Sequence, residues 1–201
     1  PHCITIHKPV STPFPETLTI SYTTSPTGRS LLGCKDDEGN PCVFTCGSPL
    51  NNRSFIPCAD APTEVTLYDA RLIVPSEFRA IMSAPQLSDP VPVPGNPSKT
   101  IFSFRMTTPL PCSTIALAVG KLAKETITKV RVPCALYAPP SLIAKALREF
   151  AEPLGAFFTT MESLLGPYPY TCYDVAIMPK CFGALGLQSP NVVFLSPTLI
   201  A

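Results

Sequence analysis

Apolar and polar residues alternate along several short segments in the first two thirds of the chain. The longest, 64–74, places every second residue on one face: Val65, Leu67, Asp69, Arg71 and Ile73. Segments 18–23, 101–106 and 115–119 are rich in β-branched, aromatic and aliphatic residues. Successive side chains of a strand point to opposite faces, so each segment is expected to form a strand. Recurrent strands with turn signals between them predict an antiparallel β-domain over residues 1–136.

After Ala138, apolar residues recur at intervals of three and four. Pro139-Pro140-Ser141 is typical of a helix start, and the apolar positions continue to Leu165. Gly166-Pro167 then provides a stop signal. Pro153 lies inside this pattern and predicts a kink or two abutting helices, because proline removes a backbone donor.

Two further apolar segments, 173–179 and 192–195, are predicted strands that follow the helix. Residues 137–201 therefore indicate the start of a second domain of α+β type in a mainly β protein. The chain contains 26 prolines, well above the usual share of about 5%. Five of them fall between residues 85 and 97 and predict an exposed extended loop there.

The composition narrows the classes of partner. Hydrophobic residues make up 45% of the chain and charged residues 14%, against about 25% charged in ordinary globular proteins. A sizeable core is therefore expected, with some apolar surface covered by further protein. The net charge of +1 and the absence of a basic block argue against nucleic acid as a partner. No apolar run approaches the roughly 20 residues that span a bilayer, so no membrane partner is expected. The start at Pro1 suggests an incomplete chain.

The cysteines and histidines do not form a recognisable metal or catalytic motif. Nine cysteines are present without a Cys-x-x-Cys pair. Cys42 and Cys46 could join Cys34 or Cys58 in a zinc site, but scattered, reduced and mostly buried thiols in a cytoplasmic protein are the favoured interpretation. The two histidines, at positions 2 and 7, lie near the start of the sequence and cannot supply a triad or a three-ligand zinc site. No catalytic residue and no metal ligand is therefore predicted.

Four segments, in order, resemble the zinc aminopeptidase family that contains leukotriene hydrolase, aminopeptidase B and aminopeptidase O. The most specific is Arg53–Pro62, RSFIPCADAP, which is similar to the family signature Arg-x-x-[Phe/Leu]-Pro-Cys-x-Asp-x-Pro. The others are 18–26, 104–120, and 166–174 together with the closing stretch. Asp60 in the signature is interpreted as an acceptor for turn amides.

The resemblance implies a saddle-like antiparallel β-domain followed by the truncated start of a thermolysin-like catalytic domain. The family's H-E-x-x-H motif and its later Glu ligand do not occur in this sequence. Zinc is therefore expected in a full-length parent and no cofactor in this fragment. Tyrosines 168, 170 and 173 are interpreted as core or interface residues.

The resemblance also implies where substrate would bind. In relatives, the segment aligned with 185–189 lies along the substrate backbone, and a Glu grips the free α-ammonium of the peptide. This chain has Leu185, Gly186, Leu187, Gln188 and Ser189 there. Gln188 brings no negative charge, so ammonium binding should be weakened. Thr45 and Gly47 stand where relatives have two substrate-contacting amides, and cannot replace them. Aminopeptidase-O-like relatives also depart from the Glu consensus.

The residues and the family resemblance leave three functions open. The first is a fragment of a zinc aminopeptidase, an enzyme that removes N-terminal residues from peptides. The fragment itself is not expected to be catalytically competent. The second is a degenerate scaffold or binding subunit of a larger assembly. The third, an independent β-domain, is disfavoured by the ordered signatures. The expected partners are a peptide substrate, if the parent is active, and the missing remainder of the catalytic domain or a protein partner.

Overall fold

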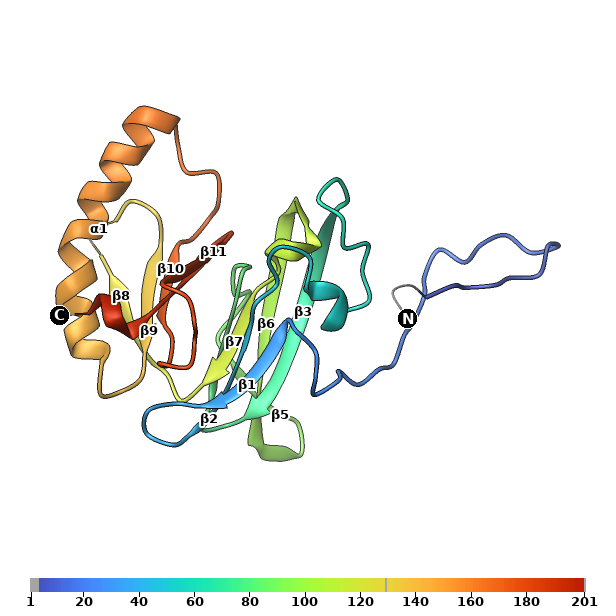
Figure 1. Ribbon diagram of the computed structural model, residues 1–201, viewed down its shortest axis with the longest axis horizontal. Coiled ribbons are helices and arrows are strands. Elements are labelled where there is room, and N and C mark those ends of the chain that lie inside the picture. Colours follow the sequence, from blue (N-terminus) through green and yellow to red (C-terminus); the bar gives the residue numbers. More distant parts are fainter. Residues whose placement is uncertain (1–3, 129, 201) are drawn as a thin grey trace.

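The computed structural model describes residues 4–128 and 130–200, which form three β-sheets and one long helix (Figure 1). Residues 4–23 form an exposed segment that extends away from the sheets, whereas Ser30, just before β1, is buried. The predicted fold class, mainly β with a smaller α+β part, is confirmed.

Two antiparallel sheets make up the first part of the chain. One has the strand order β1-β2-β7-β4, from Leu31–Lys35, Pro41–Thr45, Leu117–Gly120 and Arg79–Met82. The other has the order β3-β6-β5, from Val65–Pro75, Asn96–Pro111 and Val91–Val93. Two short 3-10 helices, Asn52–Ser54 and Cys112–Thr114, lie in the connections.

The third sheet is mixed and has the order β11-β12-β10-β9-β8. Its strands are Gly186–Ser189, Val192–Leu195, Asp174–Ile177, Cys134–Ala138 and Ala123–Ile127. β10 runs parallel to both β9 and β12, and the long helix α1, Ile143–Leu165, makes the crossover from β9 to β10. A last 3-10 helix spans Pro197–Leu199.

The third sheet is buried on both faces. One face packs on α1 through a cluster that includes Leu136, Ala146 and Val175. The other face packs on the four-stranded sheet, where Phe44 and Ala118 meet Phe194. β9 is consequently buried along its whole length, as expected for a strand covered on both sides.

Several predicted elements match the structure. β3 covers the alternating segment 64–74, and its face carrying Val65, Leu67 and Ile73 is the exposed one. β6, β7, β10 and β12 overlap the predicted strand segments 101–106, 115–119, 173–179 and 192–195. The helix ends at Gly166, which has a φ of 87°.

Other predictions were wrong. Segment 18–23 is irregular and exposed, and pairs with no strand among the described residues. The 85–97 loop contains β5, which pairs with β6. Pro153 lies inside one continuous helix, so the alternative of two abutting helices is wrong.

The domain boundary expected near residue 136 stays a prediction. That position lies inside β9, and the chain passes from the four-stranded sheet to the third sheet between Gly120 and Ala123.

Asp174 at the start of β10 joins β10 to β9, and its Oδ1 accepts a hydrogen bond from Ala135 N at 3.0 Å. Burial raises the pKa of its carboxyl to about 6, and the opposing effects of that bond, Lys124 and Tyr137 are smaller. The folded chain thus retains a proton that the unfolded chain loses near pH 4. Between about pH 4 and pH 6, ionisation of this group lowers the free energy of unfolding.

Asp174→Asn should therefore stabilise the chain above pH 6. The amide oxygen still accepts from Ala135 N, and the cost of burying a charge disappears. The expected gain at pH 7 is about 1–3 kcal/mol, with little change at pH 4. Urea unfolding at both values measures it, with Asp37→Asn, an exposed carboxylate, as the matched control. An equal gain at both pH values would contradict the assignment.

Candidate functional site

The segment predicted to lie along substrate forms an edge strand. β11 pairs with β12 on one side and is the last strand of its sheet in the described chain. An edge strand presents backbone N–H and C=O groups that can pair with another extended chain. Leu185, just before β11, is exposed.

The hairpin turn after β11 is held from two sides. Asn191 has a φ of 63°, a left-handed conformation that asparagine tolerates. The buried side-chain amide of Asn191 donates to Ser83 O at 3.4 Å. The backbone carbonyl of Asn191 accepts a hydrogen bond from Asp174 N at 2.8 Å. These bonds attach the turn to β10 and to the chain after β4, so the position of β11 is fixed by both neighbouring parts of the fold.

The side chains of Leu187 and Gln188 lie on opposite faces of β11. Leu187 packs against the core shared by the two sheets, whereas Gln188 is exposed. Gln188 lines two pockets, one of about 400 Å³ beside the C-terminal half of α1 and one of about 320 Å³ that also includes Ser189. The position predicted to meet the substrate terminus thus lies between two cavities.

Tyrosines form the wall between these cavities. Tyr168 and Tyr173 line both pockets, and their ring centroids are 5.7 Å apart in an edge-to-face arrangement. Tyr168 makes the same kind of contact with Tyr170 at 5.3 Å. The tyrosines were interpreted as core or interface residues. They are partly buried, pack on one another and line the pockets, which the sequence did not indicate.

Glu162 holds the Tyr168 segment against the end of α1. Its carboxylate accepts a hydrogen bond from Tyr168 N at 2.8 Å and pairs with Arg131. Hydrogen bonding to Arg131, supported by the Tyr168 amide, lowers the pKa of Glu162 to about 2. The carboxylate therefore stays ionised at neutral pH and continues to accept the hydrogen bond from Tyr168 N beside the larger pocket.

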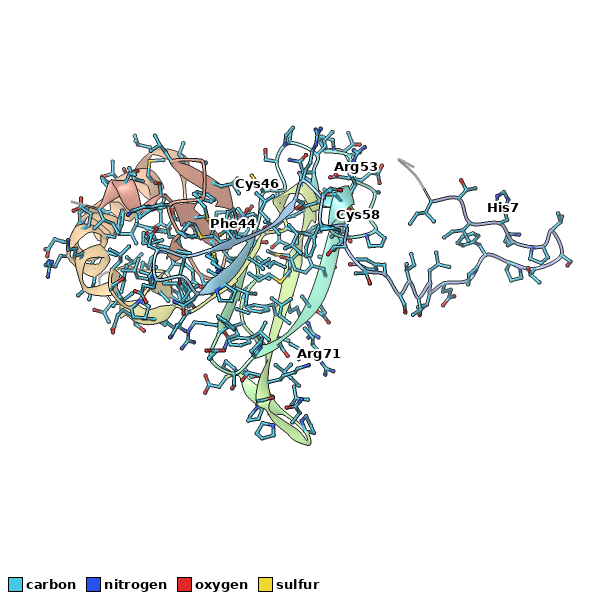
Figure 2. All side chains as sticks on the ribbon, turned by 60° about the horizontal axis from the view of Figure 1, so that its bottom comes forward. His7, Phe44, Cys46, Arg53, Cys58 and Arg71 are labelled. Atoms are coloured by element: carbon cyan, nitrogen blue, oxygen red, sulfur yellow. The ribbon has the colours of Figure 1, made fainter. Side chains whose placement is uncertain are left out.

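Thr45 and Gly47 are buried, and the contacts that they make lie in the first part of the fold. Thr45 is fully buried, and its hydroxyl accepts from Leu117 N at 2.9 Å and donates to Leu117 O at 3.3 Å. Gly47 is buried, and a Cβ there would come within 2.6 Å of the Asn52 side chain. In the described part of the chain, neither residue forms a hydrogen bond with Gln188. Their neighbour Phe44 reaches the third sheet and packs edge to face on Phe182 at 5.4 Å (Figure 2).

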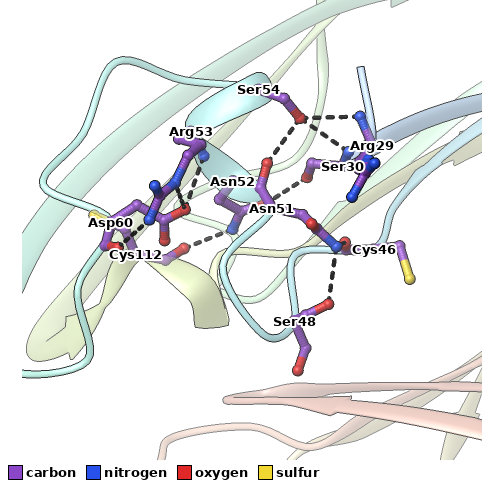
Figure 3. A network of polar contacts seen from close by, with 10 residues as sticks. All are labelled: Arg29, Ser30, Cys46, Ser48, Asn51, Asn52, Arg53, Ser54, Asp60 and Cys112. Atoms are coloured by element: carbon purple, nitrogen blue, oxygen red, sulfur yellow. Dashed lines mark hydrogen bonds and ion pairs between the residues drawn. The ribbon is translucent and has the colours of Figure 1, made fainter. Parts of the chain in front are cut away.

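The signature segment has a structural role. Arg53 pairs with the buried Asp60 carboxylate at 3.2 Å, and Arg53 N donates to the same oxygen at 3.1 Å. Asp60 therefore accepts a turn amide, as the sequence indicated. Beside it, Asn52 is fully buried and accepts from Ser30 Oγ while donating to two carbonyls (Figure 3). These contacts tie the segment to its neighbours and do not reach β11.

Three thiols that are distant in the sequence come together. The Sγ atoms of Cys34, Cys42 and Cys181 lie within 4.8 Å of one another. The sequence analysis favoured no metal ligand and considered only a zinc site of Cys42 and Cys46 with Cys34 or Cys58. Neither Cys46 nor Cys58 belongs to this group. Cys181 was missed because its distance of 139 residues from Cys42 carries no local signal.

The residues of this chain do not fit the zinc site that the resemblance implies. The sequence contains no H-E-x-x-H, and His7 is exposed on the N-terminal segment, well away from the sheets (Figure 2). His2 lies outside the described residues. None of the described helices has the length and apolar character needed to cross a bilayer.

Two groups of known proteins are similar to the chain in sequence. Rat aminopeptidase O is 26% identical over 235 residues, which cover 96% of this chain and 28% of that protein. Mouse aminopeptidase B is 37% identical over 162 residues, covering 80% and 23%. The chain thus spans about a quarter of the length of these relatives. No family model matches it.

Solved structures share the fold. Yeast LTA4 hydrolase superposes with a TM-score of 0.77 at 25% identity, covering 89% of this chain and 27% of that protein. An M1 zinc metallopeptidase from Deinococcus radiodurans superposes with a TM-score of 0.63 at 22% identity, covering 78% and 36%. The second likeness is one of fold alone.

Proposed function

Since the chain belongs to the zinc metalloaminopeptidase family of aminopeptidases O and B and leukotriene hydrolase, and matches only part of their length, we propose that it is the part of an aminopeptidase that presents the substrate-binding strand. In this proposal an extended peptide pairs with the free edge of β11, and its N-terminus lies near Gln188. The observation that carries the proposal is the position of Gln188 on an edge strand between two pockets.

Gln188 would bind the peptide terminus without neutralising its charge. A side-chain carbonyl accepts one hydrogen bond from an ammonium group, whereas a carboxylate also supplies an opposite charge. Backbone pairing along β11 would hold the rest of the peptide. The apolar wall of the larger pocket, with Phe157, Phe158 and Met161, suits an apolar side chain of the substrate.

The metal and the general base must come from residues other than those of this chain. Zinc in the full-length protein would supply the Lewis acid and the activated water. The C-terminal half of α1 exposes apolar side chains, with Phe157 62% and Leu165 77% exposed. We propose that the remainder of the catalytic domain covers this surface. The eight described cysteines are free thiols, which supports a reducing, cytoplasmic setting.

A scaffold without activity is the second candidate. Two observations favour it: the missing charge at Gln188, and the use of the Thr45 hydroxyl inside the sheet rather than toward a ligand. A scaffold would keep the edge strand for binding a partner chain and would need no zinc.

Aminoacyl-anilide hydrolysis tests the proposal. The chain by itself should show no turnover, because it contains no general base or metal ligand set of the family type. A longer protein that carries this chain together with H-E-x-x-H should hydrolyse the substrate and lose activity with a chelator. Turnover by the chain alone would contradict the proposal. A longer protein that binds zinc and stays inactive would establish the scaffold.

A further inference from the structure

We propose that Cys34, Cys42 and Cys181 form a binding site for a thiophilic d10 cation of the zinc type, separate from the zinc that the family implies. The three Sγ atoms lie within 4.8 Å of one another. In a tetrahedral site with Zn–S bonds of about 2.3 Å, sulfur atoms are about 3.8 Å apart. The observed cluster therefore needs only small side-chain rotations to enclose an ion.

Two of the ligands stand on a rigid hairpin. Cys34 on β1 and Cys42 on β2 are directly opposite each other in the strand register, with their sulfur atoms 2.8 Å apart. The turn between them is fixed by Asp36, whose Oδ1 accepts from Glu38 N at 2.9 Å and Asn40 N at 2.8 Å. Folding already holds these two thiols next to each other, so metal binding loses little further conformational entropy in bringing them together.

The third ligand comes from the other part of the fold. Cys181 lies in the loop after β10, where its neighbour Phe182 is buried between Phe44 and Phe194. Phe44 and Cys42 are both buried and two residues apart on β2. The same contact that packs the two sheets together therefore holds Cys181 over the thiol pair.

The chemistry of the group favours a cation. Thiolate sulfur is a preferred ligand of zinc and similar soft cations. A thiophilic cation displaces the protons and makes the three sulfur atoms ligands at once. Cys181 is exposed, which leaves a fourth position open to water.

A bound ion would join β1 and β2 to the loop that leads into β11. The loop runs from Cys181 through Gly183 to Gly186, where the strand begins. The consequence is a metal-dependent anchor for the edge strand, and this inference does not depend on peptidase activity.

Cobalt(II) titration of the reduced, metal-free chain tests the site. We expect one equivalent to give a thiolate-to-cobalt charge-transfer band, release of about three protons per ion, and displacement by zinc. Saturating zinc should raise the unfolding midpoint by about 5–10 °C. Cys181→Ser, on an exposed loop, should abolish the band and the shift. Cys46→Ser, a cysteine outside the group, should retain both.

Three results would overturn the site. One is the absence of a charge-transfer band in a chain whose circular dichroism is that of the folded state. Another is a band that is unchanged in Cys181→Ser. The last is thiol counting that finds Cys34 and Cys42 already joined as a disulfide in chain purified under reducing conditions.

Discussion

Asn52→Asp should lower the free energy of unfolding by about 3–5 kcal/mol, because it places a carboxylate where an amide donates to two carbonyls. Asn52 Nδ2 lies 2.6 Å from Cys112 O and 2.9 Å from Ile115 O, and Oδ1 accepts from Ser30 Oγ. The substituted oxygen would face two carbonyl oxygens in a fully buried site. A Cβ at Gly47 would come within 2.6 Å of the Asn52 side chain, so this side chain has little room to shift toward Gly47.

Chemical denaturation of the wild-type and variant chains measures the change in the free energy of unfolding. In thermal unfolding, the midpoint temperature should drop by about 10 °C. Asn96→Asp is the matched control. Its Oδ1 accepts from Ser98 Oγ at 2.6 Å in an exposed turn, so the same change of amide to carboxylate should cost under about 0.5 kcal/mol. A loss at Asn52 no larger than that at Asn96 would refute a structural role for the network in Figure 3.

Gln188→Glu should raise kcat/KM for peptides with a free N-terminus by about tenfold or more, in a full-length protein that carries this chain and is active. A charged hydrogen bond to a partly desolvated ammonium is worth roughly 1.5–3 kcal/mol, and about 1.4 kcal/mol corresponds to a factor of ten. The exposed position of Gln188 between two pockets leaves room for the contact.

The comparison of free and N-acetylated peptides isolates this effect, because acetylation removes the ammonium. The gain should disappear for acetylated substrates. Ile73→Glu, which adds a carboxylate at an exposed position on β3, should leave both substrates unchanged. An equal gain for free and acetylated peptides would remove Gln188 from the role of reading the terminus.

The alternation of 64–74 and the spacing of 142–165 determined β3 and α1, because each pattern is set by neighbours in the sequence. The same local information misled at 18–23, where strand-forming residues have no partner strand within the described chain. At Pro153 it left open two abutting helices, but the missing donor does not break the helix, whose residues Ala146 and Leu154 are packed on the third sheet.

The sequence by itself determined the mainly β fold class and the end of the helix at Gly166. Tertiary structure alone decided that β11 is an edge strand, that Gln188 lies between two pockets, that the Thr45 hydroxyl is used inside the sheet, and that Cys181 joins Cys34 and Cys42. The reason is physical. Helix and strand periodicity arise from interactions a few residues apart. The Thr45–Leu117 contact and the thiol group instead bring together residues about 70 to 150 positions apart, which only the packing of the whole fold can do.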